Sequence, residues 1–193
     1  MENTVFFSCH YEEVNDFRVE VIKNCEGIKD ISSFVDPVAW RVAKKSGEIS
    51  LRALVTAEIV GSTVTAVLIS ENTFHREWIR YEIAKSVEKG NKLIGIHLNH
   101  IKDINSETLA LGKNPFDYLG LCKNTNGRVN LIEKSETDHR WRWYPRLDVG
   151  IISSIYVYRY DVMPLSDVVP VYDWEKQDGY NNFGTWIENA VKV

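Results

Sequence analysis

The chain has 193 residues, of which 44% are apolar and 26% are charged, a composition typical of one globular domain with a sizeable core. Its formal net charge of −4 provides no global positive field that would attract nucleic acid or anionic lipid, so we expect neither as a partner. The three cysteines, Cys9, Cys25 and Cys122, are far apart in the chain, which indicates reduced thiols rather than a disulfide framework or a zinc site.

The N-terminal sequence carries no targeting pattern. It lacks both the basic segment and the long apolar segment of a signal peptide. No stretch approaches the ~20 apolar residues that are needed to span a bilayer. Together with the reduced cysteines, these features lead us to expect a cytoplasmic protein without a membrane partner.

The first half of the chain alternates between strand patterns and helix patterns. Short apolar runs, typical of strands buried on both faces, lie at residues 4–8, 63–70 and 92–98. Helical patterns lie at residues 11–24, 51–59 and 77–89, the last closed by Gly90. Strands that alternate with helices imply parallel crossovers, so we predict an α/β fold with a central parallel sheet flanked by helices. Ligands bind such sheets beyond the carboxyl ends of the strands.

After Ile101 the pattern becomes less regular. The pair Asn126-Gly127 lies between two short runs, residues 118–123 and 128–133, and predicts a β-hairpin. We also expect a turn-rich loop at residues 114–118, a strand within residues 139–144 and a closing helix at residues 182–191. No repeat, low-complexity tract or linker separates these parts. We therefore predict a single domain over residues 1–193, with a core of about residues 1–100 and a C-terminal elaboration of about residues 101–193.

The helix predicted at residues 77–89 contains a carboxylate of interest. Its buried face is made of side chains spaced four apart, namely Ile79, Ile83 and Val87. Trp78 and Glu82 are also four apart, at the edge of that face, so the indole could form a wall beside the carboxylate. From these residues alone, the commoner arrangement is a solvated glutamate with Lys85 or Lys89 as its charge partner.

Several motifs resemble those of a known family. Residues 70–82 read SENTFHREWIRYE, and this segment resembles the TIR-domain motif in which a strand ends in Ser and is followed by Phe, Trp and then Glu four residues after the Trp. The opening VFFS at residues 5–8 is similar to the first TIR strand. Within this superfamily, the chain most resembles the TIR-like component of bacterial Thoeris anti-phage systems.

That narrower resemblance rests on a set of motifs in the same order. They are VFFS-x-HY at 5–11, DFR at 16–18, RYEI at 80–83, EKGNK at 88–92, NPFDYLG at 114–120, VYDW at 171–174 and DGYN at 178–181, followed by Phe183. The resemblance covers most of the chain and is weakest at residues 24–36 and 129–169. It implies a flavodoxin-like TIR fold with an elaborated C-terminal half.

The resemblance also implies an activity, namely cleavage of NAD+ between nicotinamide and ribose. Nicotinamide leaves as a neutral group, so no general acid has to protonate it, and stabilisation is needed by the ribose as it becomes oxocarbenium-like. A carboxylate can stabilise the positive charge that develops on the ribose. The match to the TIR motif assigns this catalytic role to Glu82. The Thoeris likeness implies a cyclic ADP-ribose isomer that activates a separate effector, whereas attack by water would give ADP-ribose. NAD+ is then a substrate, and no cofactor or metal is expected.

Six further residues are candidates for substrate binding: Phe7, Ser8, His10, Tyr11, Asp36 and Trp78. The first four lie where the first strand opens into the crevice, and Trp78 precedes Glu82 by one turn. Asp36 falls in the region of the mobile TIR loop that contacts substrate or a neighbouring subunit. Structural roles are the alternatives, namely a turn or cap for Ser8 and Asp36 and core packing for Phe7 and Trp78.

Two rival functions remain open. A non-catalytic TIR scaffold would recruit partners through its loops, but it has no chemical need for the carboxylate of Glu82. A phosphoacceptor domain needs acidic residues at its strand ends, where this chain has Ser8 and Ser70. Because TIR active sites are often completed by a second subunit, the resemblance also implies self-association.

Overall fold

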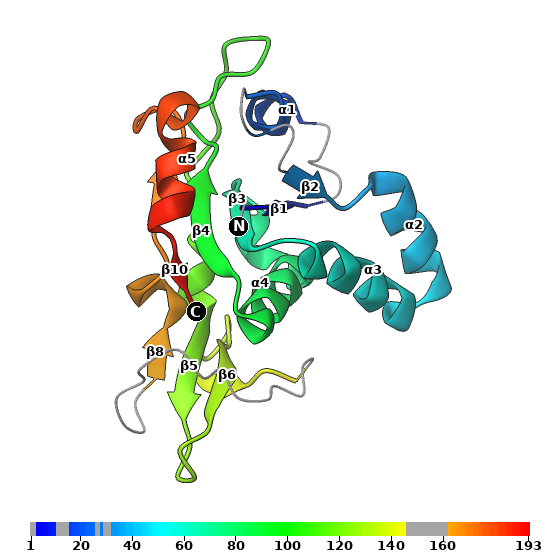
Figure 1. The fold of residues 1–193 in the computed structure, drawn as a ribbon, viewed down its shortest axis with the longest axis vertical. Helices are drawn as coiled ribbons and strands as arrows, with labels where there is room; N and C mark the ends of the chain where they lie inside the picture. Colours follow the sequence, from blue (N-terminus) through cyan, green and yellow to red (C-terminus); the bar gives the residue numbers. More distant parts are fainter. Residues whose placement is uncertain (1–2, 11–15, 26–27, 29–31, 146–161) are drawn as a thin grey trace.

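The structure, a computed structural model, describes residues 3–10, 16–25, 28, 32–145 and 162–193. A central sheet with the strand order β10-β4-β3-β1-β2 runs through the molecule, and β9 also pairs with β4 (Figure 1). These strands are β1 (Val5–Ser8), β2 (Ser32–Phe34), β3 (Val64–Ile69), β4 (Lys92–His97), β9 (Val171–Asp173) and β10 (Val191–Lys192). All of their pairings are parallel except that of β10 with β4. The predicted α/β fold with a mostly parallel sheet is confirmed.

Helices cover both faces of this sheet. One face packs against α1 (Phe17–Lys23) and α5 (Gly179–Asn189), and the other against α3 (Glu48–Val60) and α4 (Glu77–Lys89). Neighbouring residues of a strand point to opposite faces. Phe7 therefore joins the core under α1 and α5, whereas Phe6 joins the core under α3. This alternation decides which helix each residue of β1 meets.

Helix α4 has the bounds that its sequence pattern predicts. It ends at Gly90, whose φ of 78° is in the left-handed region that favours glycine. Its apolar side chains Ile79, Ile83 and Val87 are each at most 2% exposed. Burial of this stripe fixes the rotation of the helix about its axis, and that rotation directs Glu82 towards β1.

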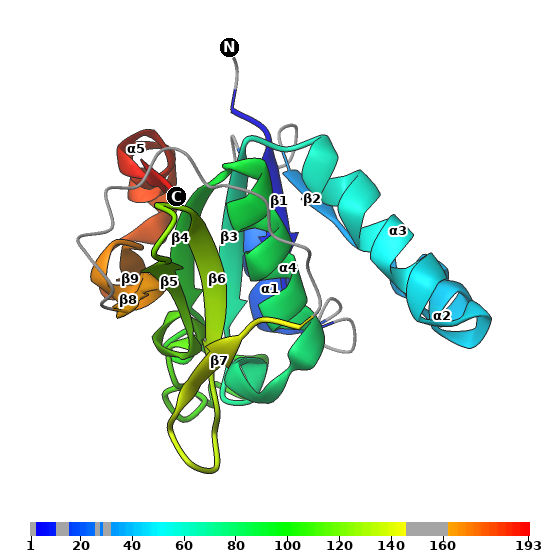
Figure 2. The same ribbon diagram turned by 90° about the horizontal axis from the view of Figure 1, so that it is seen from below.

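A second, antiparallel sheet packs beside α4, as Figure 2 shows. Its strand order is β7-β6-β5-β8, with β5 (Leu119–Lys123), β6 (Val129–Lys134), β7 (Trp141–Trp143) and β8 (Val162–Pro164). The hairpin predicted at Asn126-Gly127 is confirmed: β5 pairs with β6, and Gly127 has a φ of 79°. Short 3-10 helices precede α4 and flank this sheet, namely η1 (Thr73–His75), η2 (Pro115–Tyr118) and η3 (Leu165–Asp167).

The C-terminal segments return to the central layer. Strands β9 and β10 both pair with β4, and α5 packs its side chains Phe183, Trp186 and Ile187 into the same core as β1. These elements follow residue 100, and they complete the edge of the sheet that the first half begins. The helix expected at residues 182–191 begins earlier and ends earlier, and Ala190 is its C-cap.

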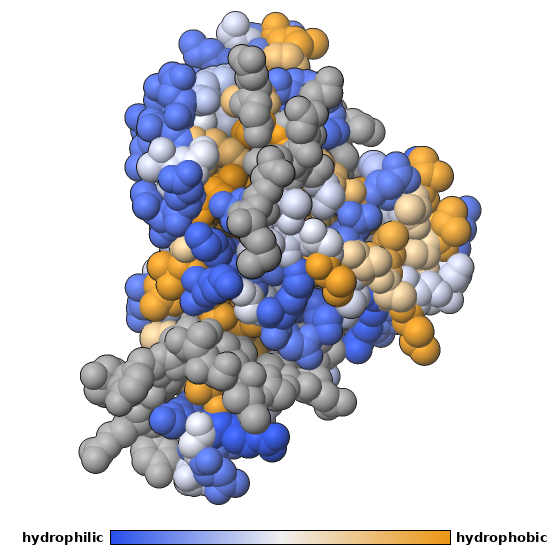
Figure 3. Space-filling view, viewed as in Figure 1, coloured by the Kyte–Doolittle hydropathy of each residue, from blue (hydrophilic) through white to orange (hydrophobic). Residues whose placement is uncertain are grey.

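The segment after β2 differs from expectation. Instead of the loop in which we expected Asp36, the chain forms helix α2 (Pro37–Ser46) directly after this residue. Helix α2 packs against α3 as a hairpin that projects from the body (Figure 2). Apolar side chains gather on the surface over this hairpin (Figure 3), including exposed Val38, Val42 and Ile49. Among the residues that the structure describes, no helix is long and apolar enough to cross a membrane.

Candidate functional site

The site is centred on a contact between β1 and α4. Ser8 is the last residue of β1 and, like Phe6, points to the face of the sheet that α3 and α4 cover. Glu82 lies in the middle of α4 and is 2% exposed, and Ser8 is fully buried. The Ser8 hydroxyl donates a hydrogen bond of 2.5 Å to Oε2 of Glu82. Two of the residues predicted for the site therefore meet at the carboxyl end of the first strand.

Burial determines the protonation of this carboxyl group. Loss of contact with water raises the pKa of Glu82 to about 8, although the hydrogen bond from Ser8 acts in the opposite direction. A carboxyl that changes its charge near neutral pH is typical of functional sites. The solvated arrangement with a lysine partner is not found: Lys85 pairs with Glu88, and Lys89 donates to the carbonyl oxygens of Ile59 and Ser62.

Phe7 lies on the other side of the sheet from Glu82. Its ring stacks between Phe34, with centroids 4.8 Å apart, and Phe183, with centroids 5.7 Å apart. It is 1% exposed. These contacts are those of core packing, the structural alternative for this residue, and a role for its ring edge in substrate binding stays a prediction.

Trp78 and Asp36 both contact the helical hairpin formed by α2 and α3: Trp78 packs against it from α4, and Asp36 precedes α2. The indole of Trp78 makes edge contacts with Trp40, at 5.5 Å between centroids, and with Tyr81, at 5.4 Å. Asp36 is exposed and caps α2, because its Oδ1 accepts hydrogen bonds from the backbone N–H groups of Val38 and Ala39. Asp36 is thus the N-cap of α2. Its contact with substrate or a neighbouring subunit stays a prediction.

His10 is half-buried and lies two residues beyond Ser8, where the chain leaves the sheet. Tyr11 lies outside the described residues. The structure therefore brings Ser8 into contact with Glu82 and places His10 just beyond the end of the same strand, β1. The sheet itself separates Phe7 from Glu82.

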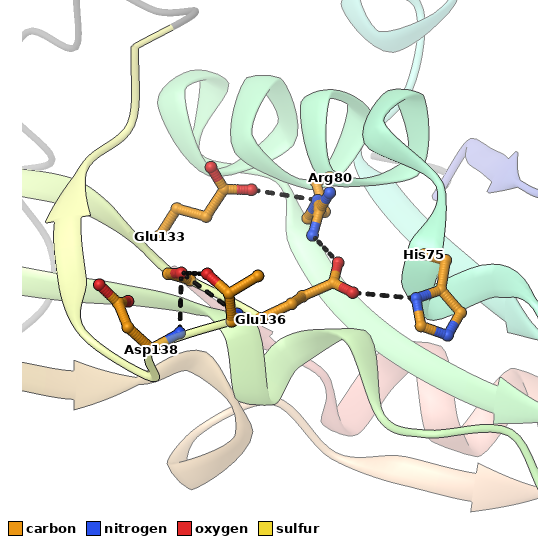
Figure 4. A network of polar contacts seen from close by, with 7 residues as sticks. His75, Arg80, Glu133, Glu136 and Asp138 are labelled. Carbon is orange, nitrogen blue, oxygen red and sulfur yellow. Dashed lines mark hydrogen bonds and ion pairs between the residues drawn. The ribbon is translucent and has the colours of Figure 1, made fainter.

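A polar network that the sequence did not reveal holds the start of α4 (Figure 4). Arg80 Nε lies 3.0 Å from Glu133 of β6, and its Nη1 lies 2.7 Å from Glu136 in the turn that follows. The second oxygen of Glu136 lies 3.0 Å from Nδ1 of His75 in η1. These contacts tie the second sheet to the helix that carries Glu82, two residues from Arg80.

No group of three or more His, Cys, Asp and Glu residues within the described ranges is arranged to hold a metal ion. His97 is the last residue of β4, and His100 follows three residues later. Nδ1 of His100 lies 2.5 Å from Oδ2 of Asp173 on β9. Burial lowers the pKa of His97. This cluster joins the end of β9 to the segment that follows β4.

Comparison with known proteins points to one family. The family model described as "Thoeris protein ThsB, TIR-like domain" matches residues 6–103, a range that includes both Ser8 and Glu82. The chain is also 42% identical over 193 residues to the "Putative cyclic ADP-D-ribose synthase ThsB1" of Bacillus cereus (strain MSX-D12). That match covers 97% of this chain and 100% of the relative, so it includes the C-terminal half that the family model does not reach.

Proposed function

The chain belongs to the TIR-like ThsB family of Thoeris proteins, and on that premise we propose that it cleaves NAD+ and closes the remaining ADP-ribose into a cyclic signal. The observation that carries this proposal is the buried carboxyl of Glu82, bound to Ser8 at the carboxyl end of β1. Parallel α/β sheets bind their ligands at that edge. Burial of this carboxyl away from water disfavours its charged form and costs stability, which a purely structural role would not favour.

In the first step, the bond between C1′ of the ribose and the nicotinamide nitrogen breaks. The electron pair goes to the nitrogen and cancels its positive charge, so nicotinamide leaves as a neutral molecule. The positive charge moves to the ribose, where the carboxylate of Glu82 stabilises it. The dry surroundings that raise the pKa of Glu82 also strengthen this attraction once the group is ionised.

In the second step, a nucleophile attacks C1′. A hydroxyl or ring nitrogen of the adenosine half closes the ring and gives a cyclic ADP-ribose isomer, with a proton released when the attacking group is a hydroxyl or an amine. Water as the nucleophile gives linear ADP-ribose and a proton instead. Within a Thoeris system, the cyclic product serves as the signal that activates a separate effector protein during phage infection.

The test is product analysis by mass spectrometry. The protein is incubated with NAD+, with and without lysate of phage-infected cells, beside Glu82→Gln and Glu82→Ala. Glu88→Gln is the matched control, because Glu88 lies on the same helix and is half-buried, and pairs with Lys85. We expect the mass of NAD+ minus nicotinamide from the wild type and from Glu88→Gln, and at least a ~100-fold loss in both Glu82 variants.

Other results separate the alternatives. ADP-ribose as the sole product would retain the enzyme but exclude cyclisation. Intact NAD+ with every folded variant and every lysate would favour the non-catalytic scaffold, since a scaffold does not require the charge of Glu82.

A further inference from the structure

A cavity lies at the same edge of the sheet as Ser8 and Glu82. It has a volume of about 140 Å³, and the described residues that line it are Asp16, Val19, Ser70, Glu71, Asn72, Leu98 and Leu109. Ser70 directly follows β3 and Leu98 directly follows β4, so the cavity lies beyond the carboxyl ends of the two central strands. Neither Ser8 nor Glu82 is among its lining residues.

The segment of residues 99–109, which contributes Leu109 to the cavity, is held in place by several hydrogen bonds. Arg18 of α1 is 5% exposed, and it donates from Nε to the carbonyl of Ile101 at 2.9 Å and from Nη2 to that of Glu107 at 2.7 Å. The N–H of Leu109 donates to the carbonyl of Asn99 at 3.0 Å. These hydrogen bonds hold the segment from 99 to 109 over the strand ends, and a site held in place by such bonds loses little entropy on binding.

The same segment continues to Gly112, where it packs against the residue that follows β3. A Cβ atom placed on it would lie 2.0 Å from the carbonyl oxygen of Ser70, which is far closer than a carbon atom can approach. The backbone of residue 112 thus packs directly on the backbone of a cavity-lining residue. Only glycine permits this close approach of the two backbones. This packing, like the hydrogen bonds of Arg18 and Leu109, fixes the segment beside the cavity.

The lining of the cavity selects a type of ligand. Val19, Leu98 and Leu109 supply apolar surface, whereas Asp16 and Glu71 supply carboxylates and Asn72 an amide. The carboxylates of Asp16 and Glu71 disfavour a phosphate in this cavity, because like charges repel. An apolar wall with hydrogen-bond acceptors at the rim suits a flat, uncharged ring that carries an amino group, such as adenine.

We propose that this cavity binds the adenine base of NAD+ while the nicotinamide ribose lies at Ser8 and Glu82. This inference rests on the proposed function, which assigns the reacting ribose to Glu82 and leaves the other end of the dinucleotide to be bound. Ser8 pairs with Val67 across β1 and β3, and Ser70 is three residues further along, roughly 10 Å at the rise of a strand. One dinucleotide can bridge that separation, with its diphosphate outside the acidic cavity.

The experiment compares NAD+ with nicotinamide mononucleotide, which has the same scissile bond but no adenosine. Leu109→Trp fills the cavity, and Leu111→Trp is the matched control, because Leu111 lies in the same segment, is 66% exposed and does not line the cavity. We expect Leu109→Trp to raise the KM for NAD+ at least tenfold and to leave cleavage of nicotinamide mononucleotide unchanged. We expect the control to behave as the wild type with both substrates.

A second variant covers the case in which Leu109→Trp does not fold. Asn72→Ala removes one exposed amide from the rim, and we expect it to raise the KM for NAD+ about threefold to tenfold without changing kcat. If neither variant alters the KM for NAD+ relative to that for nicotinamide mononucleotide, the proposal is wrong.

Calorimetric titration of Glu82→Gln with adenosine measures binding to the cavity in the absence of catalysis. Binding that Leu109→Trp abolishes and Leu111→Trp preserves supports the cavity even if NAD+ is never cleaved, in which case the proposed function fails alone. Two results would contradict the cavity proposal and leave the proposed function intact. In both, the wild type cleaves NAD+. In the first, adenosine binds Glu82→Gln equally well with and without Leu109→Trp, and in the second, adenosine does not bind at all.

Discussion

The hydroxyl of Ser8 and the carboxylate of Glu82 are 2.5 Å apart in space and 74 positions apart in sequence. The contact depends on two independent features: the alternation of β1, which turns Ser8 towards α4, and the apolar stripe of α4, which sets its rotation. It also removes Glu82 from water, so that the group to which we assign the catalytic role has a pKa of about 8.

The rate of NAD+ cleavage should follow the ionisation of Glu82. Because only the carboxylate stabilises a positive ribose and the pKa in the free protein is about 8, we expect kcat/KM to rise about tenfold per pH unit below pH 7 and to level off above pH 8. Initial rates at low NAD+ concentration, measured from pH 5 to pH 9, provide the check. A profile that is flat across this range would contradict a buried, titrating Glu82.

Glu82→Gln should stabilise the protein while abolishing activity. The folded pKa of about 8 lies above the ordinary value of 4.5, so stability is lost as pH rises between these two values, because the unfolded chain ionises first. The amide cannot ionise, so we expect the variant to gain up to ~4 kcal/mol at pH 8 and little near pH 4.5. Urea unfolding at the two pH values measures the difference, and equal gains at both would be inconsistent with this cause.

Ser8→Ala should move the pH profile rather than lower it uniformly. The Ser8 hydrogen bond lowers the pKa of Glu82, so its loss should raise that pKa further and reduce kcat/KM at pH 7 by about tenfold for each unit of the shift. At pH 9 the activity should recover towards that of the wild type. Ser46→Ala, which alters a serine on α2, should leave the profile in place. A loss of equal size at every pH would indicate that Ser8 contacts the substrate.

Much of this fold could be predicted from sequence because its main signals are local. The stripe of α4 with Gly90 after it, and the Asn126-Gly127 turn between two apolar runs, are both complete within about a dozen residues. Strands β9 and β10 have three and two residues, too few for any periodicity to show. Helix α2 buries Trp40 but leaves Val38 and Val42 exposed, so its apolar side chains do not mark a face packed on the sheet. Asp36-Pro37 at its start is nevertheless a cap signal that could have indicated this helix.

The site was predictable in a different way. Glu82 and Ser8 were found through a motif, whereas their contact is a property of the folded chain. The partners of Arg80 could not be found from sequence, because Glu133 and Glu136 belong to a hairpin more than 50 residues away. Nothing in the spacing of these charges distinguishes them from a solvated surface.

Arg80→Ala should loosen the attachment of α4 to the second sheet. Arg80 is 12% exposed in its side chain and meets two carboxylates, so we expect a loss of about 1–2 kcal/mol in the free energy of unfolding. Arg142→Ala is the control, because Arg142 pairs with Asp138 in an exposed position and should cost less than ~0.5 kcal/mol. Chemical denaturation at low salt measures both, and equal losses would show that the contacts in Figure 4 do not stabilise the helix.

Gly112→Ala and Gly184→Ala should have opposite effects. At residue 112 an added Cβ would meet the backbone carbonyl of Ser70, so either the segment over the cavity or the end of β3 must move, and we expect a loss of at least ~2 kcal/mol. At residue 184, in the middle of α5, a Cβ would meet nothing within 4 Å, and alanine should add about 0.5–1 kcal/mol through its higher helix propensity. Thermal unfolding of the two variants side by side measures the contrast. If Gly112→Ala were as stable as the wild type, the segment would not be packed on Ser70, and the preformed cavity would lose one of its supports.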